Sequence, residues 1–171
     1  MATFILTVIG DDRPGLVSAI SAPINAHGAS WERSQMSRLA GKFAGIVLVT
    51  VDDDRHDALV ADLTALEAEG LQVALERTDE PVERESLRLE LELLGADRPG
   101  IVAEISASLA ARGVSIEELR TDVRDAPMAG GTLFEASAVL HAPPATSTEA
   151  LRSVLEGLAD ELMVDISLSR G

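Results

Sequence analysis

The sequence predicts an α+β fold in which one small domain of order β-α-β-β-α-β occurs twice. An internal repeat is the main reason: GDDRPGLV at 10–17 returns as GADRPGIV at 95–102, and GAS at 28–30 returns at the same offset as GVS at 113–115. Hydrophobic residues make up 46% of the 171 positions but aromatic residues only 2%, so each copy of about 80 residues is expected to have an aliphatic core. A turn used twice favours paired, symmetry-related sites over a single catalytic centre.

Each copy is expected to begin with a strand. Residues 3–9 are β-branched and apolar. In residues 87–93 leucine alternates with charged residues, and this period of two buries one face of a strand and leaves the other in water. The pattern is typical of an antiparallel sheet that is covered on one side only.

The repeated Pro-Gly turn is expected to lead into a helix. Apolar residues recur at helical spacing in both copies, namely Leu16, Ile20 and Ile24, and Ile101, Ile105 and Leu109. Pro14 and Pro99 suit a first helical turn, and Pro23 is expected to kink the first helix or to weaken its last turn. Gly28 and Gly113 are expected to end the helices in the left-handed conformation.

A strand pair follows the helix in each copy. In the first copy, strands at 30–39 and 43–51 flank a short turn. In the second copy, strands at 115–124 and 132–142 flank a longer loop with a proline and paired glycines, which indicates an excursion rather than a tight turn.

A second helix and a last strand complete each copy. Leucine stripes mark the two helices, at Leu59, Leu63 and Leu66, and at Leu151, Leu155 and Leu158. Asp54 is expected to cap the first of them, and residues 146–149 have the spacing of a capping box. The last strands are expected at 71–76 and 162–168, and Gly70 is expected to end the helix before the first of these.

This element order corresponds to a ferredoxin-like domain, a four-stranded antiparallel sheet with both helices on one face. We expect the first domain at residues 1–77, a charged linker at 78–85 and the second domain at 86–171. Because a core of this size is marginal by itself, the two domains are expected to pack against each other or against another chain.

Composition excludes several classes of function. The net charge of −15 disfavours direct binding of nucleic acid, and the absence of cysteine excludes disulfides and thiolate metal sites. No apolar run approaches the roughly 20 residues that span a bilayer, and the first residues lack a basic signal-peptide region. We therefore expect a cytoplasmic protein that does not associate with membranes.

The sequence offers no set of residues for catalysis. It contains neither Gly-x-Ser-x-Gly nor a phosphate-binding Gly-Lys-Ser/Thr motif. Its three histidines, His27, His56 and His141, share no metal-ligand spacing, so no metal or cofactor is expected. Trp31 is expected to pack between copies.

The two repeated turns carry a resemblance to a known family. Asp12-Arg13-Pro14-Gly15-Leu16-Val17 with His27-Gly28-Ala29-Ser30, and the equivalent residues 97–102 and 112–115, resemble the ACT family of regulatory domains over nearly the whole chain. Two copies without an enzyme domain are most similar to the glycine cleavage system transcriptional repressor group. The resemblance implies a sensor of small amino acids that forms a dimer and acts on a protein partner such as a transcription factor.

The resemblance also implies that the domains pack side by side and that a ligand binds at the seam between them, against the turn after strand one and the start of strand two. A helix N-terminus offers free N–H groups to the ligand carboxylate, and a nearby acid accepts the ammonium group. The residues carried over are Asp11, Asp12, Arg13, Pro14, Gly15, Leu16 and Ser30 in the first copy, and Asp97, Arg98, Pro99, Gly100, Ile101 and Ser115 in the second.

Two departures from the family pattern leave alternatives open. Ser30 and Ser115 stand where members of the family often have asparagine, and Ala96 replaces Asp11 in the second copy, so the two sites need not be equivalent. Asp12 and Asp97 are also good helix caps, which is an alternative role for them. At the level of the protein, a ligand-independent protein–protein adaptor is the main alternative, and a small hydrolase of the same fold is a weaker one.

Overall fold

The computed structural model describes residues 1–79, 85–128 and 130–171. The chain divides into two compact units, Met1–Val82 and Glu83–Gly171, and each has its own hydrophobic core. The linker expected at 78–85 falls mainly on residues 80–84, which lie outside the described residues. Thr78 still belongs to the first unit, since its N–H donates to the carbonyl of Thr3 at 3.0 Å.

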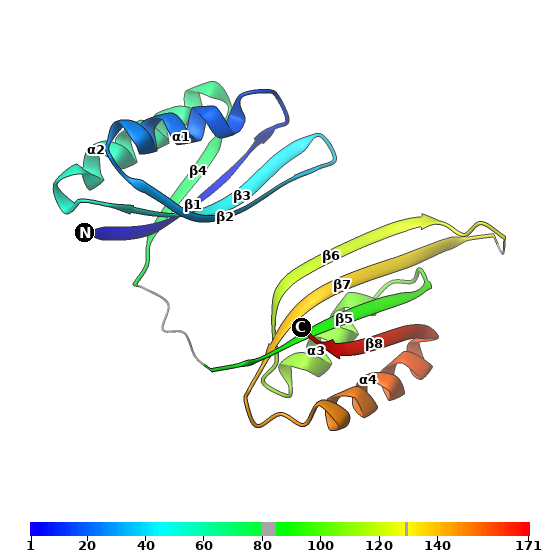
Figure 1. Ribbon diagram of the computed structural model, residues 1–171. Coiled ribbons are helices and arrows are strands. Elements are labelled where there is room, and N and C mark those ends of the chain that lie inside the picture. Colours follow the sequence, from blue (N-terminus) through cyan, green and yellow to red (C-terminus); the bar gives the residue numbers. More distant parts are fainter. Residues whose placement is uncertain (80–84, 129) are drawn as a thin grey trace. The chain divides into compact units, whose positions relative to one another are not determined.

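Both units have the predicted β-α-β-β-α-β order (Figure 1). The first unit consists of β1 (Ala2–Asp11), α1 (Leu16–Ala26), β2 (Ser30–Leu39), β3 (Lys42–Val51), α2 (Asp53–Thr64), the 3-10 helix η1 (Ala65–Glu69) and β4 (Gln72–Arg77). The second consists of β5 (Leu87–Ala96), α3 (Ile101–Ala110), β6 (Ser115–Asp125), β7 (Thr132–Ala142), α4 (Thr148–Leu162) and β8 (Val164–Arg170). The fold class is therefore confirmed.

Each unit has one antiparallel sheet of four strands, in the order β2-β3-β1-β4 and β6-β7-β5-β8. The helices of each unit lie on one face of its sheet and leave the other face bare (Figure 1). The strands β2 and β6 are edge strands, and each contains a bulge, at Glu32 and at Glu117, where the pairing with β3 or β7 shifts by one residue.

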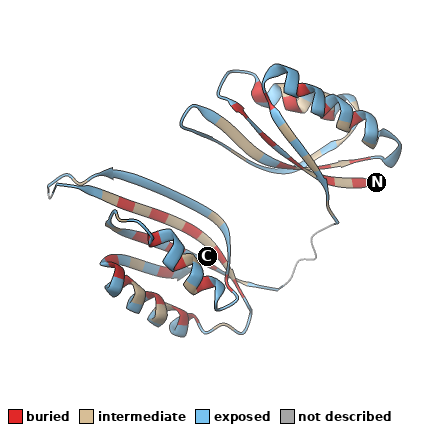
Figure 2. Cartoon of the chain, turned by 180° about the vertical axis from the view of Figure 1, so that it is seen from behind, coloured by how far each residue is buried: buried red, intermediate tan, exposed pale blue. Residues whose placement is uncertain are grey.

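The aliphatic stripes found in the sequence form the two cores. The predicted helical residues Leu16, Ile20, Ile24, Ile101, Ile105 and Leu109 are all buried, as are the leucines of α2 and α4 except for the half-buried Leu158. Figure 2 shows the same alternation along β7, where buried and half-buried residues follow one another, whereas the edge strand β6 is exposed over most of its length. The helix-facing sides of the inner strands therefore supply the sheet half of each core.

The helix starts differ from the prediction. Helices α1 and α3 begin only after Gly15 and Gly100, which adopt φ of +88° and +96°, so Pro14 and Pro99 lie in the preceding turn. The carbonyls of these glycines accept the first helical hydrogen bonds, and no side chain caps either helix. Glycine reaches this left-handed conformation without the strain that a Cβ would introduce. Pro23 lies inside α1, which continues to Ala26.

Of the other predicted helix ends, those of α4 and η1 agree with the structure and the start of α2 does not. Asp54 is inside α2 and does not cap it, because the helix already begins at Asp53. Ser147 caps α4 by accepting the N–H of Ala150 at 3.2 Å, so the capping residue lies inside the predicted 146–149 segment. Gly70 ends η1 with φ of +86°, as expected of a helix-terminating glycine.

Candidate ligand-binding site

The two repeated turns have the same backbone geometry. Each is tied to the strand hairpin beside it, because the N–H of Asp12 donates to the carbonyl of Gly41 and the N–H of Asp97 to the carbonyl of Thr132, both at 2.9 Å. Each turn ends in a left-handed glycine with no side-chain cap on the helix that follows. Since a helix N-terminus without a cap has unpaired N–H donors and a partial positive charge, both turns suit a carboxylate.

In the first turn, the acidic side chains already have partners in the same unit. Lys42, the single lysine of the chain, pairs with Asp11, and Arg38 Nη1 donates to Asp12 Oδ2 at 3.2 Å. Arg13 reaches away from the turn and donates from Nη2 to the carbonyl of Glu69 at 3.1 Å. Of the two roles considered for Asp12, helix capping is therefore wrong, because its carboxylate points to β2 and no side chain caps α1.

In the second turn the acidic side chain has no such partner among the described residues. Ala96 replaces Asp11, and Asp97 is exposed and makes no ion pair or side-chain hydrogen bond among the described residues. Arg98 lies 3.7 Å from Glu104 through its Nη2, but its Nε is buried and has no acceptor in the part of the chain that the structure describes. In the second turn, the unpaired carboxylate of Asp97 and the unpaired Nε of Arg98 therefore belong to adjacent residues.

The ion pair at Asp11 gives a prediction about titration. The hydrogen bond from Lys42, with its positive charge, holds the pKa of Asp11 below the ordinary value. Lys42→Met is expected to raise the pKa of Asp11 toward that value, while Lys42→Arg keeps it low. Carboxyl chemical shifts recorded against pH would show this.

The sign of the linked stability effect follows from the direction of that shift. Because the folded-state pKa of Asp11 is lowered, its contribution to stability is present above the unfolded-state pKa and disappears as pH falls through the folded-state pKa. The pair is fully exposed, so the stability effect is small. An unchanged Asp11 titration in Lys42→Met would show that the pair does not form in solution.

The structure does not bring the predicted serines to the turns within one unit. Ser30 pairs with Thr50, and Thr50 pairs with Thr3, so Ser30 lies at the opposite end of the sheet from Asp11. Asp11 lies eight positions after Thr3 along β1, which corresponds to about 25 Å. In the second unit Ser115 likewise pairs with His141, far from the turn. The predicted site residues therefore form two separate groups in each unit.

Two glycines that the sequence reasoning did not single out control the packing of the turns. A Cβ on Gly95 would lie 2.4 Å from Val164 Cγ1 and 2.9 Å from Val164 Cα, and one on Gly10 would lie 2.6 Å from Leu71 Cδ2. By contrast, a Cβ on Gly15 would meet nothing within 4 Å. The signal was present in the sequence, because Gly10 and Gly95 begin the repeated segment, but only the pairing with β8 and the end of η1 shows their role.

An apolar surface at the edge of the second unit was also missed. Four side chains on α3 and on the helix-facing side of β6 remain exposed, namely Val102, Ile116, Leu119 and Val123. In the first unit the equivalent positions include Val17, which is exposed, and Trp31, which is half-buried against the core. The bulge in β6 interrupts the alternation of side chains and hides this pattern in the sequence.

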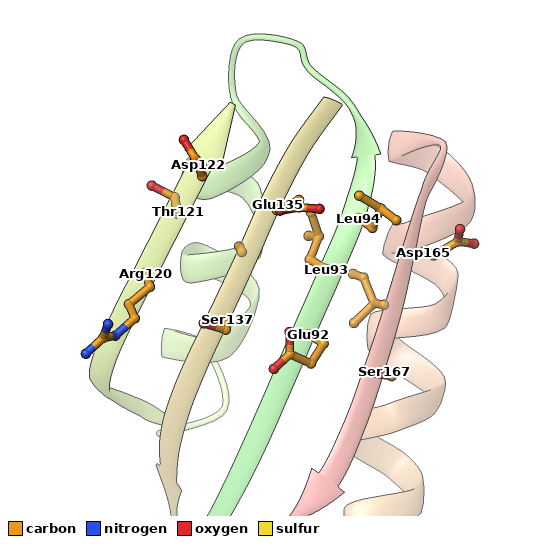
Figure 3. A pocket seen from close by; sticks show the side chains of 12 residues that line it. Glu92, Leu93, Leu94, Arg120, Thr121, Asp122, Glu135, Ser137, Asp165 and Ser167 are labelled. Atoms are coloured by element: carbon orange, nitrogen blue, oxygen red, sulfur yellow. The ribbon is translucent and has the colours of Figure 1, made fainter. Parts of the chain in front are cut away.

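A shallow depression of about 530 Å³ lies on the bare face of the second sheet (Figure 3). Glu92, Glu135, Asp122 and Asp165 line it together with a single arginine, Arg120. The carboxylates outnumber the cation, so this surface repels the carboxylate of an amino acid. We therefore do not assign the depression to the ligand.

Among the described residues, no group of histidine and acidic side chains has the arrangement of a metal site. His27 pairs with Asp62 at 2.7 Å, and His141 contacts Glu117 and Ser86. No helix in the described part of the chain is long and apolar enough to cross a membrane.

The repeated turns and the twin sheets agree with comparisons to known proteins. The model of the ACT domain family matches residues 2–76 and 88–169, one match in each unit. The chain belongs to the ACT domain family. Its tandem ACT domains superpose on the crystal structure of a protein from Galdieria sulphuraria with a TM-score of 0.87 and 32% identity, covering 99% of this chain and 98% of the other.

Two curated relatives differ in how much of their length the ACT chain covers. It is 22% identical to the glycine cleavage system transcriptional repressor of Escherichia coli over an alignment of 169 residues. This alignment covers 96% of this chain and 88% of the repressor. It is 32% identical to phosphoserine phosphatase SerB2 of Mycobacterium tuberculosis over an alignment of 133 residues, and this alignment covers 74% of this chain. The chain spans only about a third, 32%, of that phosphatase.

Proposed function

We propose that the chain is a regulatory ACT-domain protein of the cytoplasm that binds a small amino acid and changes its association with a protein partner. The observation that carries the proposal is the turn built twice, with an uncapped helix N-terminus and an acidic residue in each copy. The match to the transcriptional repressor over most of its length supports a regulatory role over a catalytic one. A shift between two associated states requires that the ligand bind one of them more tightly.

A second chain would complete the site. Because β2 is an edge strand, β2 of another chain can pair with it antiparallel about a two-fold axis. This pairing places Ser30 of one chain beside the Leu39 end of the other β2, where Arg38 contacts Asp12. The two residue groups that lie about 25 Å apart within one unit then meet across the seam. The edge β6 of the second unit offers the same geometry, and its exposed apolar side chains favour such pairing.

We propose further that the second turn binds the ligand more strongly than the first. A ligand ammonium at Asp12 must compete with Arg38 for the same carboxylate, whereas Asp97 has no competing cation among the described residues. The buried Nε of Arg98 lacks an acceptor, and a ligand carboxylate would satisfy it. The proposed ligand is therefore a zwitterionic amino acid at Asp97, Arg98 and Gly100.

Isothermal titration with a panel of amino acids tests the proposal. At least one is expected to bind with a dissociation constant between about 1 μM and 1 mM. Asp97→Asn is expected to weaken binding by about tenfold or more, since it removes a charge-assisted hydrogen bond. The matched variant Asp12→Asn is expected to change it by less than about threefold, because that carboxylate is already engaged.

The possible results separate the proposals. No heat from any amino acid up to several millimolar would contradict ligand binding and would favour the ligand-independent adaptor. A larger loss in Asp12→Asn than in Asp97→Asn would keep the sensor but would reverse the order of the two turns. Circular dichroism of both variants checks that neither change unfolds a unit.

A further inference from the structure

The bare face of the first sheet is almost free of acidic side chains, although the chain is strongly acidic. Its two central strands, β1 and β3, present aliphatic residues and threonines there. The aliphatic positions are Ile5, Ile9, Ala44, Ile46 and Leu48, and the threonines are Thr3, Thr7 and Thr50. Ile46 is 46% exposed and Ile9 is 40% exposed, so the face is open within its own unit.

The corresponding face of the second sheet is different. Six acidic side chains lie on it, Glu90, Glu92, Glu118, Asp122, Glu135 and Asp165, together with three arginines. Both sheets share a topology, so the contrast does not come from the fold. In a protein of net charge −15, an aliphatic sheet face that lacks the excess of acidic side chains found on the second sheet indicates a surface that is covered when the protein functions.

The few charges on the first face are arranged in a self-complementary way. One row across the sheet reads Arg33, Leu48, Ile5 and Glu76 from the β2 edge to the β4 edge, because these residues are paired in register. Neither Arg33 nor Glu76 makes an ion pair within the described residues. A two-fold axis that runs along the strands between β1 and β3 places β2 of one copy opposite β4 of the other, so that Arg33 meets Glu76 in both halves.

The same two-fold axis also brings the remaining charged residues of the face, Lys42 and Asp11, opposite residues of the other sign. Lys42 on β3 and Asp11 on β1 face each other across the pairing at the turn end of the sheet. Under the two-fold operation, Lys42 of one copy lies opposite Asp11 of the other, and Leu48 lies opposite Ile5. Each charged residue on the face thus lies opposite a residue of the other sign in the second copy, and the aliphatic residues of the two copies lie opposite each other.

We propose that this face binds the same face of a second copy of the chain, as two sheets stacked about 10 Å apart. Four strands by four outward-facing rows give roughly 500 Å² per copy, or about 1,000 Å² in total, near the lower limit for a specific interface. The interface is therefore expected to be weak and reversible. This stacking uses the face of the sheet. The pairing of β2 edge strands described under the proposed function uses only the edge and leaves the face free.

Sedimentation over about 1 μM to 1 mM tests the stacking. Ile46→Glu is expected to weaken the association about a hundredfold, because it buries two unpaired carboxylates at the centre of the interface. Leu94→Glu is the matched control: Leu94 is 40% exposed on the bare face of the second sheet, and its replacement is expected to have no effect. If edge pairing also occurs, Ile46→Glu halves the mass of the assembly.

A charge exchange makes the test specific for the proposed axis. Arg33→Glu and Glu76→Arg are each expected to weaken the association about tenfold, and the double variant is expected to restore it. A wild-type chain that is monomeric throughout, or an assembly that Ile46→Glu leaves intact, would overturn the proposal. A double variant no better than either single one would overturn the axis. None of these results depends on amino-acid binding, so they test the stacking separately from the proposal that the protein senses an amino acid.

Discussion

Gly95→Ala is expected to destabilise the second unit by about 3 kcal/mol, which is a large part of the stability of a domain of this size. The new Cβ would lie 2.8 Å from the Cβ and 2.9 Å from the Cα of Val164, the residue paired with Gly95 on β8. Because the contact involves backbone as well as side chain, β8 has to move away from β5. A flexible side chain could rotate out of the way at lower cost, but a paired strand cannot.

Urea unfolding of the variant measures this loss, and Gly100→Ala is the control. Gly100 lies five residues further on with φ of +96°, and a Cβ there would meet only Glu104 Oε1, at an ordinary van der Waals distance of 3.6 Å. Alanine at this position therefore costs about 1 kcal/mol of backbone strain and causes no steric clash. Adding Val164→Ala to Gly95→Ala is expected to recover only part of the loss, since the Cα and Cβ of residue 164 remain. Equal destabilisation by Gly95→Ala and Gly100→Ala would contradict the steric explanation.

Phe4→Ala is expected to destabilise the first unit by about 4 kcal/mol. Phe4 is one of few aromatic residues, is 1% exposed, and packs edge-to-face against His56 with the ring centroids 5.7 Å apart. Removing the ring leaves a cavity between β1 and α2 that the surrounding leucines and valines fill only in part. Phe4→Leu keeps most of the volume and is expected to cost about 1 kcal/mol.

Hydrogen exchange resolved by residue is the suitable measurement, because the two units have separate core clusters. In Phe4→Ala, amides of β1, β3 and α2 are expected to lose protection, while amides of β5, β7 and α4 keep theirs. Equal loss of protection in both units would show that they unfold as one cooperative body.

Much of the fold could be predicted because it depends on periodicity along the chain. The alternation of leucines in 87–93 and the helical stripe from Leu16 to Ile24 decide which side of each element is buried, whatever the element packs against. The repeat at 10–17 and 95–102 extended the same conclusions to both halves. Seven of the eight predicted strands have both ends within two residues of the observed ends, and the hairpin at Ala40-Gly41 forms with both residues at positive φ.

The starts of α1 and α3 could not be predicted in the same way. A sequence of aspartate, arginine, proline and glycine is compatible with a proline that starts a helix and an aspartate that caps it. The left-handed conformation of Gly15 moves the helix start beyond Pro14 and turns the Asp12 carboxylate toward Arg38 on β2. Local propensity allows both arrangements, and the tertiary contact to β2 decides between them.

The sequence alone determined that two like domains exist, which faces of their elements are apolar, and that a glycine turn recurs, since each of these depends on residue type and spacing. The tertiary structure decided which residues meet. It separated Ser30 from Asp12 by the length of a strand, gave the first turn partners that the second lacks, and placed Arg33 and Glu76 on one row of a bare sheet. Such relations arise from strand order and register, and chain positions far apart carry no local signal of them.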